Sequence, residues 1–222
     1  MARNLVGVVA SFIYFFGLLI AQRYLPLKTL EHKRKFVHIM LGNWWFFVLY
    51  FFDNVIFALI TPVAFIFINY ISLKRGNENG LLSSLEREET SFGIIAYPIA
   101  MALLVIISFV IFDDLRIGGI GLLSLAYGDG IAALAGKRFH YKKFSVFGNS
   151  KTVSGCIGML LSTFVVVLLY LNLVYAIPIK SAIVCAMLIS LAATIAEAIT
   201  PLGLDDISVP LISVFAFYIL SQ

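Results

Sequence analysis

The sequence has few charged residues, and it has too few polar residues to form the surface of a soluble protein. Only 13% of its 222 residues are charged, whereas 61% are hydrophobic, and the mean hydropathy is +1.01. A soluble fold of this size cannot cover so much apolar surface with so little polar material. The composition therefore excludes an ordinary soluble protein and favours an integral membrane protein.

Cysteines, repeats and long loops are also scarce. Cys156 and Cys185 are the only two cysteines; both fall in apolar stretches without metal-ligand spacing, so we expect them to act as small hydrophobic side chains. The sequence shows no internal repeat and no low-complexity tract. Its longest loops, 74–91 and 137–152, are too short for a separate soluble domain. We therefore expect residues 1–222 to form a single transmembrane domain.

Seven apolar stretches are long enough to cross a bilayer core, which needs about 20 residues per helix. They are residues 5–21, 36–52, 55–73, 92–112, 117–136, 153–177 and 181–199. A shorter eighth stretch, 207–220, either spans the membrane or is re-entrant. The first stretch lacks a small-residue cleavage site, so we interpret it as a retained helix. The sequence predicts an all-α, polytopic helical membrane protein with about seven or eight transmembrane helices.

The basic residues are concentrated in alternate loops. The formal net charge is +4 and there are 16 Lys and Arg residues, of which only Arg3, Arg116 and Lys180 lie outside the first, third and fifth loops. The positive-inside rule places those three loops in the cytoplasm and the N-terminus outside. The basic excess is then a topology signal, and we expect no nucleic-acid partner. The compact loops favour a prokaryotic cytoplasmic (inner) membrane.

The cytoplasmic loops and helix ends contain four polar clusters, and the first lies at the start of the second span. Arg34, His38 and Gly42 recur every four residues and so form one stripe of a helix, with Lys35 beside it. Arg and Lys suit a phosphate ligand, although the same residues could instead anchor the helix at anionic lipid. His38 lies further into the span, where ionisable groups are by default functional.

The second and fourth clusters are acidic. One is Glu86, Glu88 and Glu89, which form either a solvated loop or a partner for a metal or base; the other is Glu197, Asp205 and Asp206. Glu197 follows a long apolar run and therefore needs a cation as its partner. The two aspartates could equally belong to an ordinary loop.

The third cluster surrounds Asp129 in the fifth span. Small residues recur there every four positions, at Ser124, Gly128, Ala132 and Gly136. This pattern is typical of close helix packing, but packing does not explain a buried aspartate, which costs about 2.5–3.5 kcal/mol on insertion scales. Asp129 beside glycine backbone and several lysines fits a Mg²⁺–nucleotide site. The spacing and residue types differ from a Walker A loop.

In this order, the clusters resemble the membrane-bound CTP-dependent lipid-alcohol kinases, the family of dolichol kinase, phytol kinase and CTP-dependent diacylglycerol kinase. The resemblance covers most of the chain and rests on the ordered set Arg34, Lys35, His38, Gly42, Gly128, Asp129, Gly130, Ala132, Gly136, Lys151, Thr152, Gly155, Glu197, Asp205, Asp206, Val209 and Pro210. The chain departs from the family at His140 and Ser154, where glycine and an acidic residue are usual, and at Asp206, where asparagine is usual.

The resemblance implies phosphorylation of a membrane lipid alcohol by CTP, with Mg²⁺, at the cytoplasmic face of the bilayer. The acceptor would be a polyprenol-, phytol- or geranylgeraniol-like alcohol or diacylglycerol. It implies catalytic roles for Asp129, His38 and Lys151, with His38 as candidate general base. The residues it implies for nucleotide and phosphate binding are Arg34, Lys35, Gly128, Gly130, Gly136, Lys137, Thr152 and Gly155. The implied metal ligands are Asp129, Glu197 and Asp206.

Two other functions remain open from the sequence. A cytidylyltransferase that activates a lipid phosphate with CTP would use similar groups, but the longer signature of the diacylglycerol phosphate cytidylyltransferases is absent. A small ion-coupled transporter could use Asp129 and Glu197 as an ion path. The polar groups, however, gather at one face of the membrane rather than in two related half-sites. The sequence does not indicate an oligomeric state.

Overall fold

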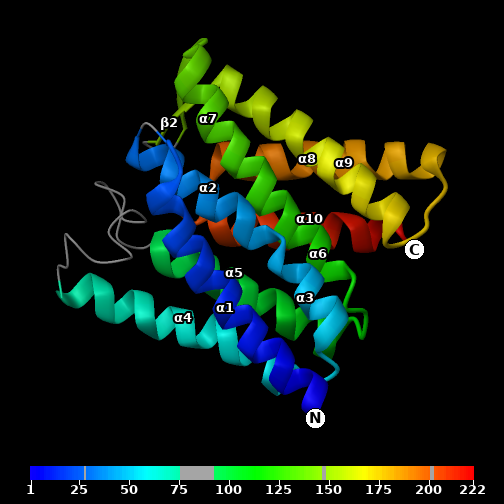
Figure 1. Ribbon diagram of the computed structural model, residues 1–222. Helices are drawn as coiled ribbons and strands as arrows, with labels where there is room; N and C mark the ends of the chain where they lie inside the picture. The colour runs from blue at the N-terminus through cyan, green and yellow to red at the C-terminus, as the bar shows by residue number, and fades with distance from the viewer. Residues whose placement is uncertain (28, 76–92, 147–148, 201–202) are drawn as a thin grey trace. The chain divides into compact units, whose positions relative to one another are not determined.

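The computed structural model of the chain (Figure 1) describes residues 1–27, 29–75, 93–146, 149–200 and 203–222. These residues form two compact units, Met1–Leu115 and Arg116–Gln222. Nearly all of the described structure is helical, and its single sheet is a two-stranded hairpin. The prediction of an all-α polytopic membrane protein is confirmed. Whether the two units act as one domain stays a prediction.

The first unit consists of helices separated by short connections. They are α1 (Ala2–Tyr24), α2 (Leu30–Gly42), α3 (Trp44–Phe51), α4 (Val55–Arg75), α5 (Gly93–Ile106) and the π-helical turn η2 (Ile107–Ile111). Helices α2 and α3 together cover residues 36–51 of the predicted span 36–52, with an interruption at Asn43. The acidic residues 86–89 lie outside the described residues, so their predicted role stays a prediction.

Aromatic side chains form the core of the first unit. Trp44 and Trp45 at the start of α3 are fully buried, and each indole N–H has a partner, as buried tryptophan requires. Trp44 Nε1 donates to Ser11 Oγ and Trp45 Nε1 donates to the Leu115 carbonyl, both at 2.8 Å. These bonds fix α3 against α1 and against the end of the unit.

The second unit begins with one continuous helical segment. It comprises α6 (Ile117–Leu123), the π-helical turn η3 (Ser124–Asp129) and α7 (Gly130–Phe139). The antiparallel hairpin of β1 (Lys143–Val146) and β2 (Asn149–Thr152) follows. Figure 1 shows this hairpin at the end where α7 finishes and α8 begins. The unit is completed by α8 (Val153–Leu173), α9 (Ile179–Ile199) and α10 (Asp205–Leu220).

Glycines allow α7 to approach α8 closely. A Cβ at Gly158 would lie 2.8 Å from the Ala135 Cβ, and one at Gly155 would lie 3.3 Å from the Ala132 carbonyl oxygen. Real Cβ atoms essentially never come as close as 2.8 Å to such a neighbour, and 3.3 Å is tighter than nine in ten real Cβ contacts. A side chain at either position would therefore push the two helices apart, as at other small-residue interfaces between membrane helices.

Six helices of the described residues are long and apolar enough to cross a membrane. They are Ala2–Tyr24, Val55–Lys74, Ile94–Ile111, Ile117–Phe139, Val153–Leu173 and Ile179–Ile199. The two other predicted spans correspond to α2 with α3, which is interrupted, and to α10, which has 16 residues and is about 24 Å long at 1.5 Å per residue. Each of the eight predicted stretches is thus helical, and six meet the length and composition of a span.

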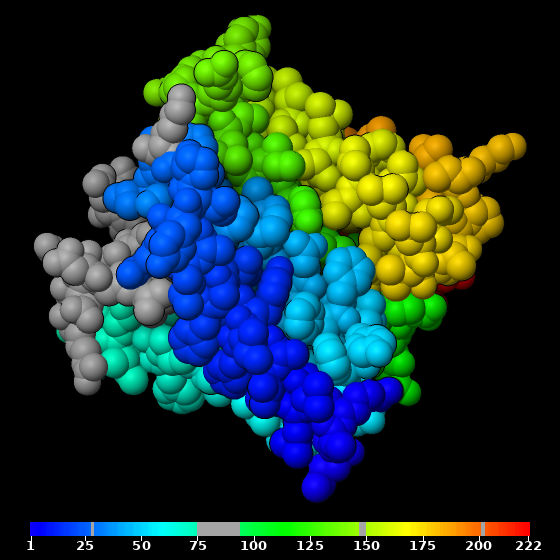
Figure 2. Space-filling view, viewed as in Figure 1, coloured from blue at the N-terminus to red at the C-terminus, as the bar shows by residue number. Residues whose placement is uncertain are grey.

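The surface of α8 shows the apolar face expected of a lipid-facing helix. Ile157, Leu161, Val165 and Leu169 recur every four residues and are all exposed. Helix α8, yellow in Figure 2, forms part of the visible surface. The segment Ile117–Phe139, by contrast, is the most buried of the six candidate spans. Asp129 therefore lies on a helix that is covered by protein, where an intramembrane carboxylate can be stabilised by polar partners.

Candidate active site

Three buried carboxylates from separate elements meet at one end of the second unit. Asp129 is the last residue of η3, Glu197 lies in the last turn of α9, and Asp205 is the first residue of α10. One carboxylate oxygen of each lies within 4.8 Å of the others, and all three residues are buried. Because like charges in a dry environment repel strongly, such a cluster requires cations to balance it.

Lys151 supplies one such cation. Its Nζ donates a hydrogen bond to Glu197 Oε1 and lies 3.4 Å from Asp205 Oδ2. The lysine side chain is 17% exposed and both carboxylates are 7% exposed. Burial alone would lower the pKa of the Lys151 ammonium, but Glu197 and Asp205 outweigh this effect and raise the pKa above its ordinary value. Lys151 is therefore charged at neutral pH.

The hairpin explains how Lys151 reaches the carboxylates. Lys151 is the second-last residue of β2 and pairs with Phe144 of β1 in the antiparallel register. The next residue, Thr152, caps α8: its Oγ1 accepts a hydrogen bond of 3.0 Å from the Gly155 N–H, as is common at helix N-termini. A short strand fixed at one end by a helix cap thus holds the lysine backbone beside α9 and α10.

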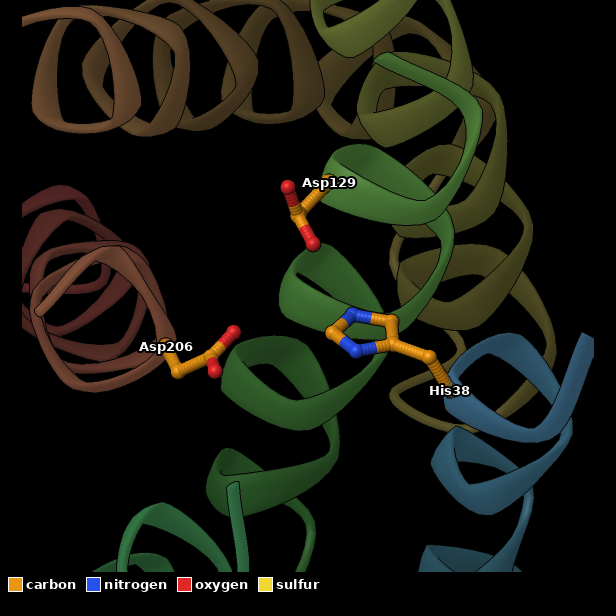
Figure 3. Close-up of side chains that lie close together, drawn as sticks. All are labelled: His38, Asp129 and Asp206. Carbon is orange, nitrogen blue, oxygen red and sulfur yellow. The ribbon is translucent and has the colours of Figure 1, made fainter. Parts of the chain in front are cut away.

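Asp206 lies on another side of Asp129. One of its carboxylate oxygens is within 4.8 Å of an Asp129 oxygen, and Figure 3 shows the two carboxylates turned toward the same region. Both Asp205 and Asp206 belong to the first turn of α10, where the helix dipole favours negative charge. Asp129 therefore lies close to the Glu197 and Asp205 carboxylates and also to the Asp206 carboxylate.

The donor set fits a hard divalent cation. Mg²⁺ prefers carboxylate oxygens at about 2.1 Å, so two of its ligand oxygens can be up to about 4.2 Å apart. The oxygens of Asp129, Glu197 and Asp205, all within 4.8 Å of one another, need to move only slightly to meet this geometry. The ammonium of Lys151 already lies on two of the three carboxylates, which shows that the cluster accommodates positive charge. The residues present therefore fit Mg²⁺.

Two of the glycines predicted to bind the nucleotide, Gly128 and Gly136, pack against α8 and its N-terminal cap. A Cβ at Gly128 would collide with Thr163 Oγ1 and lie 2.7 Å from the Met159 sulfur, and one at Gly136 would lie 2.8 Å from Thr152 Oγ1. This placement is the helix packing that the small-residue spacing indicates. Gly130 is buried at the start of α7. A role for these glycines in binding phosphate stays a prediction.

The predicted residues of the first unit lie on α2. Arg34 forms an ion pair with Glu31 on the same helix, with N–O distances of 2.6 and 3.1 Å, and Lys35 is buried. The His38 ring, drawn in Figure 3 on α2, packs edge-on against Tyr97 with 4.7 Å between ring centroids. The Tyr97 hydroxyl also donates to the His38 carbonyl at 3.0 Å. The roles of these residues toward phosphate and as general base stay predictions.

Asp205 was not among the metal ligands predicted from the sequence. The metal prediction named Asp129, Glu197 and Asp206, whereas the structure groups Asp205 with Asp129 and Glu197. The available signal was that Asp205 is one of two adjacent aspartates in the short segment between the predicted spans 181–199 and 207–220. Lys137, predicted to contact phosphate, is exposed in the last turn of α7; that contact stays a prediction.

The chain is similar to curated phytol kinases. It is 29% identical to "Phytol kinase" of Synechocystis sp. over 193 residues, which covers 84% of this chain and 78% of that protein. It is 30% identical to "Probable phytol kinase 1, chloroplastic" of Glycine max, with 81% and 63% covered, so it spans less than two thirds of the soybean protein. The Zea mays "Probable phytol kinase, chloroplastic" is 27% identical, with 90% and 70% covered. No family model and no solved structure matches the chain.

Proposed function

We propose that this chain is a member of the membrane-bound lipid-alcohol kinase family, to which the similar phytol kinases belong, and that it transfers the γ-phosphate of CTP to the hydroxyl of a long-chain lipid alcohol. The observation that carries the proposal is the group of buried carboxylates Asp129, Glu197 and Asp205, with Lys151 beside them, at one end of membrane-length helices. Phosphoryl transfer depends on positioned metal and cations around the phosphates, and this cluster can supply both.

The reaction has a simple balance. The acceptor oxygen attacks the γ-phosphorus of CTP, and the bond from that phosphorus to the β,γ-bridging oxygen breaks. CDP leaves with the electron pair of that bond, and the hydroxyl proton passes to a base on the protein or to water. The products are CDP and a lipid phosphate. His38 is our candidate for that base.

The metal ligands are proposed to be Asp129, Glu197 and Asp205, with Asp206 as a further contact through its position beside Asp129. A bound Mg²⁺ would neutralise charge on the phosphates. Lys151, Arg34 and Lys35 would place positive charge around the remaining phosphate oxygens. Gly130 and the exposed Lys137 at the two ends of α7 are proposed to contact the nucleotide.

The position of the site also suits a lipid acceptor. Lys151 and Thr152 lie immediately before α8, and α8 exposes an apolar stripe suited to lipid. A lipid alcohol keeps its chain in the bilayer and its hydroxyl at the interface, whereas a nucleotide arrives from water. A site at the polar ends of spans can receive both. We propose that this end faces the cytoplasm, in a prokaryotic inner membrane.

The test is turnover of purified protein in detergent or vesicles with CTP labelled in turn at the γ-phosphate and at the cytosine. The acceptor panel is phytol, geranylgeraniol, dolichol and diacylglycerol. We expect γ-label in a lipid phosphate, release of CDP, a higher rate with CTP than with ATP, and loss of activity in excess EDTA. Cytosine label in the lipid with pyrophosphate release would instead identify a cytidylyltransferase. No conversion of CTP with any acceptor would overturn the proposal.

A further inference from the structure

The side chain of Lys151 lies where a divalent cation would be expected. Its Nζ contacts Glu197 and Asp205, and the oxygens of these two residues, with one from Asp129, form the group within 4.8 Å. Three carboxylates and one ammonium leave the cluster with more negative than positive charge. Two of the three carboxylates of this group are therefore already engaged by a side chain of the protein itself.

Simultaneous binding of an ammonium and a divalent cation to these carboxylates is unfavourable. Both are positively charged, and at separations of a few ångströms inside a protein their repulsion is strong. A divalent cation balances three carboxylates better than a single ammonium does. Binding of the cation should therefore displace the ammonium rather than add to it.

Lys151 is suited to such a displacement. Its backbone is held by the β1–β2 pairing and by the α8 cap that follows, but its side chain is a flexible four-carbon stem with a compact charge. The ammonium can swing without any change in the backbone. The displaced ammonium then needs a new anionic partner, which a nucleotide phosphate supplies.

We infer that Lys151 is a placeholder cation: in the ligand-free protein its ammonium holds the Glu197 and Asp205 carboxylates together, and it yields them to a divalent cation when substrate binds. This inference rests on the proposed function and assigns Lys151 a positioning role within the same site. The displaced ammonium then pairs with phosphate. Cation and nucleotide consequently bind cooperatively, because phosphate gives Lys151 an alternative partner.

The first test measures Mn²⁺ binding to detergent-purified protein without nucleotide or lipid alcohol. Wild type is compared with Lys151→Met and with the control Lys143→Met, which removes an exposed lysine on the neighbouring strand. We expect Lys151→Met to bind Mn²⁺ at least about fivefold more tightly, the lower end of typical coupling between sites, and the control to match wild type. Equal or weaker binding by Lys151→Met would overturn the inference, because a lysine that competes with the cation for Glu197 and Asp205 must weaken its binding.

The second test uses wild-type protein, so it does not depend on the variant folding. The rate at which an amine-acylating reagent modifies Lys151 is followed by mass spectrometry with and without Mn²⁺. We expect Mn²⁺ to raise the rate at Lys151 several-fold, because the displaced ammonium becomes more accessible, and to leave Lys143 unchanged. An unchanged or lower rate at Lys151 would contradict displacement. Neither measurement uses turnover, so failure here is distinct from failure of the proposed kinase activity.

Discussion

Asp129 is the last residue of the π-helical turn η3 and is only 5% exposed. It is close to Glu197, Asp205 and Asp206, so it lies among the densest negative charge described in the second unit. Short π-helical turns within α-helices frequently occur at functional sites. A carboxylate in such surroundings destabilises the fold unless a cation compensates it.

We predict that Asp129→Asn removes most kinase activity without unfolding the protein. The amide keeps the size of the side chain and one acceptor oxygen, but it loses the charge that would hold Mg²⁺. Turnover with CTP should fall on the order of 10²–10³-fold, as when one well-placed electrostatic group is removed. A thermal melt in detergent should show equal or greater stability, because repulsion within the acidic cluster is reduced.

The control for this variant is Asp53→Asn. Asp53 is an exposed residue that pairs with Arg3 at 3.0 Å, far along the chain from the cluster, and we expect this change to leave turnover at the wild-type level. Asp129→Asn protein that melts normally yet keeps more than roughly a third of wild-type turnover, well outside the range for an electrostatic group, would remove Asp129 from the mechanism.

Gly128 and Thr163 lie against each other, and we expect substitutions of these two residues to have opposite effects on stability. A Cβ at Gly128 would meet Thr163 Oγ1 and Met159, so Gly128→Ala should lower the melting temperature through overpacking, which typically costs about 1–3 kcal/mol. Thr163 Oγ1 is buried and has no hydrogen-bond partner among the residues that the structure describes. Thr163→Val should therefore leave stability unchanged or raise it, because an unpaired buried hydroxyl is unfavourable.

A double-mutant cycle checks this contact. Adding Thr163→Ala to Gly128→Ala should recover part of the lost stability, since the alanine makes room for the new methyl group. Strictly additive losses in the thermal melts would show that Gly128 and Thr163 do not constrain each other.

Sequence reasoning identified most of the acidic residues but could not assign them to positions in space. Glu197 and Asp129 stand out because each is a charge in an apolar stretch. Asp205 and Asp206 are adjacent, and neighbouring helical residues point about 100° apart. Only the orientation of α10 decides which of them joins Asp129 and Glu197, and that orientation depends on packing against α9 and α6 rather than on spacing.

At the scale of whole elements, hydropathy predicted where helices lie but not how they are interrupted. The eight apolar stretches all proved helical. The break at Asn43, the π-helical turns η2 and η3, and the β1–β2 hairpin were not predicted. Hydropathy measures the length of an apolar segment, whereas these features depend on which backbone carbonyl each N–H selects.

The start of α8 gives a prediction at this scale. Thr152 Oγ1 accepts the Gly155 N–H and lies against Gly136, so it both caps α8 and fills the contact with α7. Thr152→Ala should destabilise the protein by about 1 kcal/mol, the usual cost of losing a helix cap. Thr152→Ser keeps the capping oxygen and should lose much less.

Thermal melts of the two variants in the same detergent measure this difference. Mn²⁺ binding by Thr152→Ala reports separately on whether the cap also positions Lys151. Equal melting temperatures for the serine and alanine variants would show that the hydroxyl does not cap α8 in the folded protein.

At the scale of the whole molecule, the positions of the basic residues indicate which end of the second unit faces the cytoplasm. Lys137, Arg138, Lys142 and Lys143 are exposed around the end of α7 and the start of the hairpin, next in sequence to the apolar segment Ile117–Phe139. Cations in this position are typical of the cytoplasmic ends of spans. The carboxylate cluster belongs to the same end of the second unit, since Lys151 lies on the hairpin.

We therefore predict that position 142 faces the cytoplasm, whereas positions 53 and 113 face the opposite side. Single cysteines at these positions, in a background with Cys156 and Cys185 replaced, can be treated in intact cells with a membrane-impermeant thiol reagent. Positions 53 and 113 should react in intact cells, and position 142 only after the cells are opened. Because a nucleotide is supplied from the cytoplasm, the orientation of the hairpin decides whether CTP can reach Lys151. Labelling of position 142 from outside would contradict both the topology and a cytoplasmic site for phosphoryl transfer.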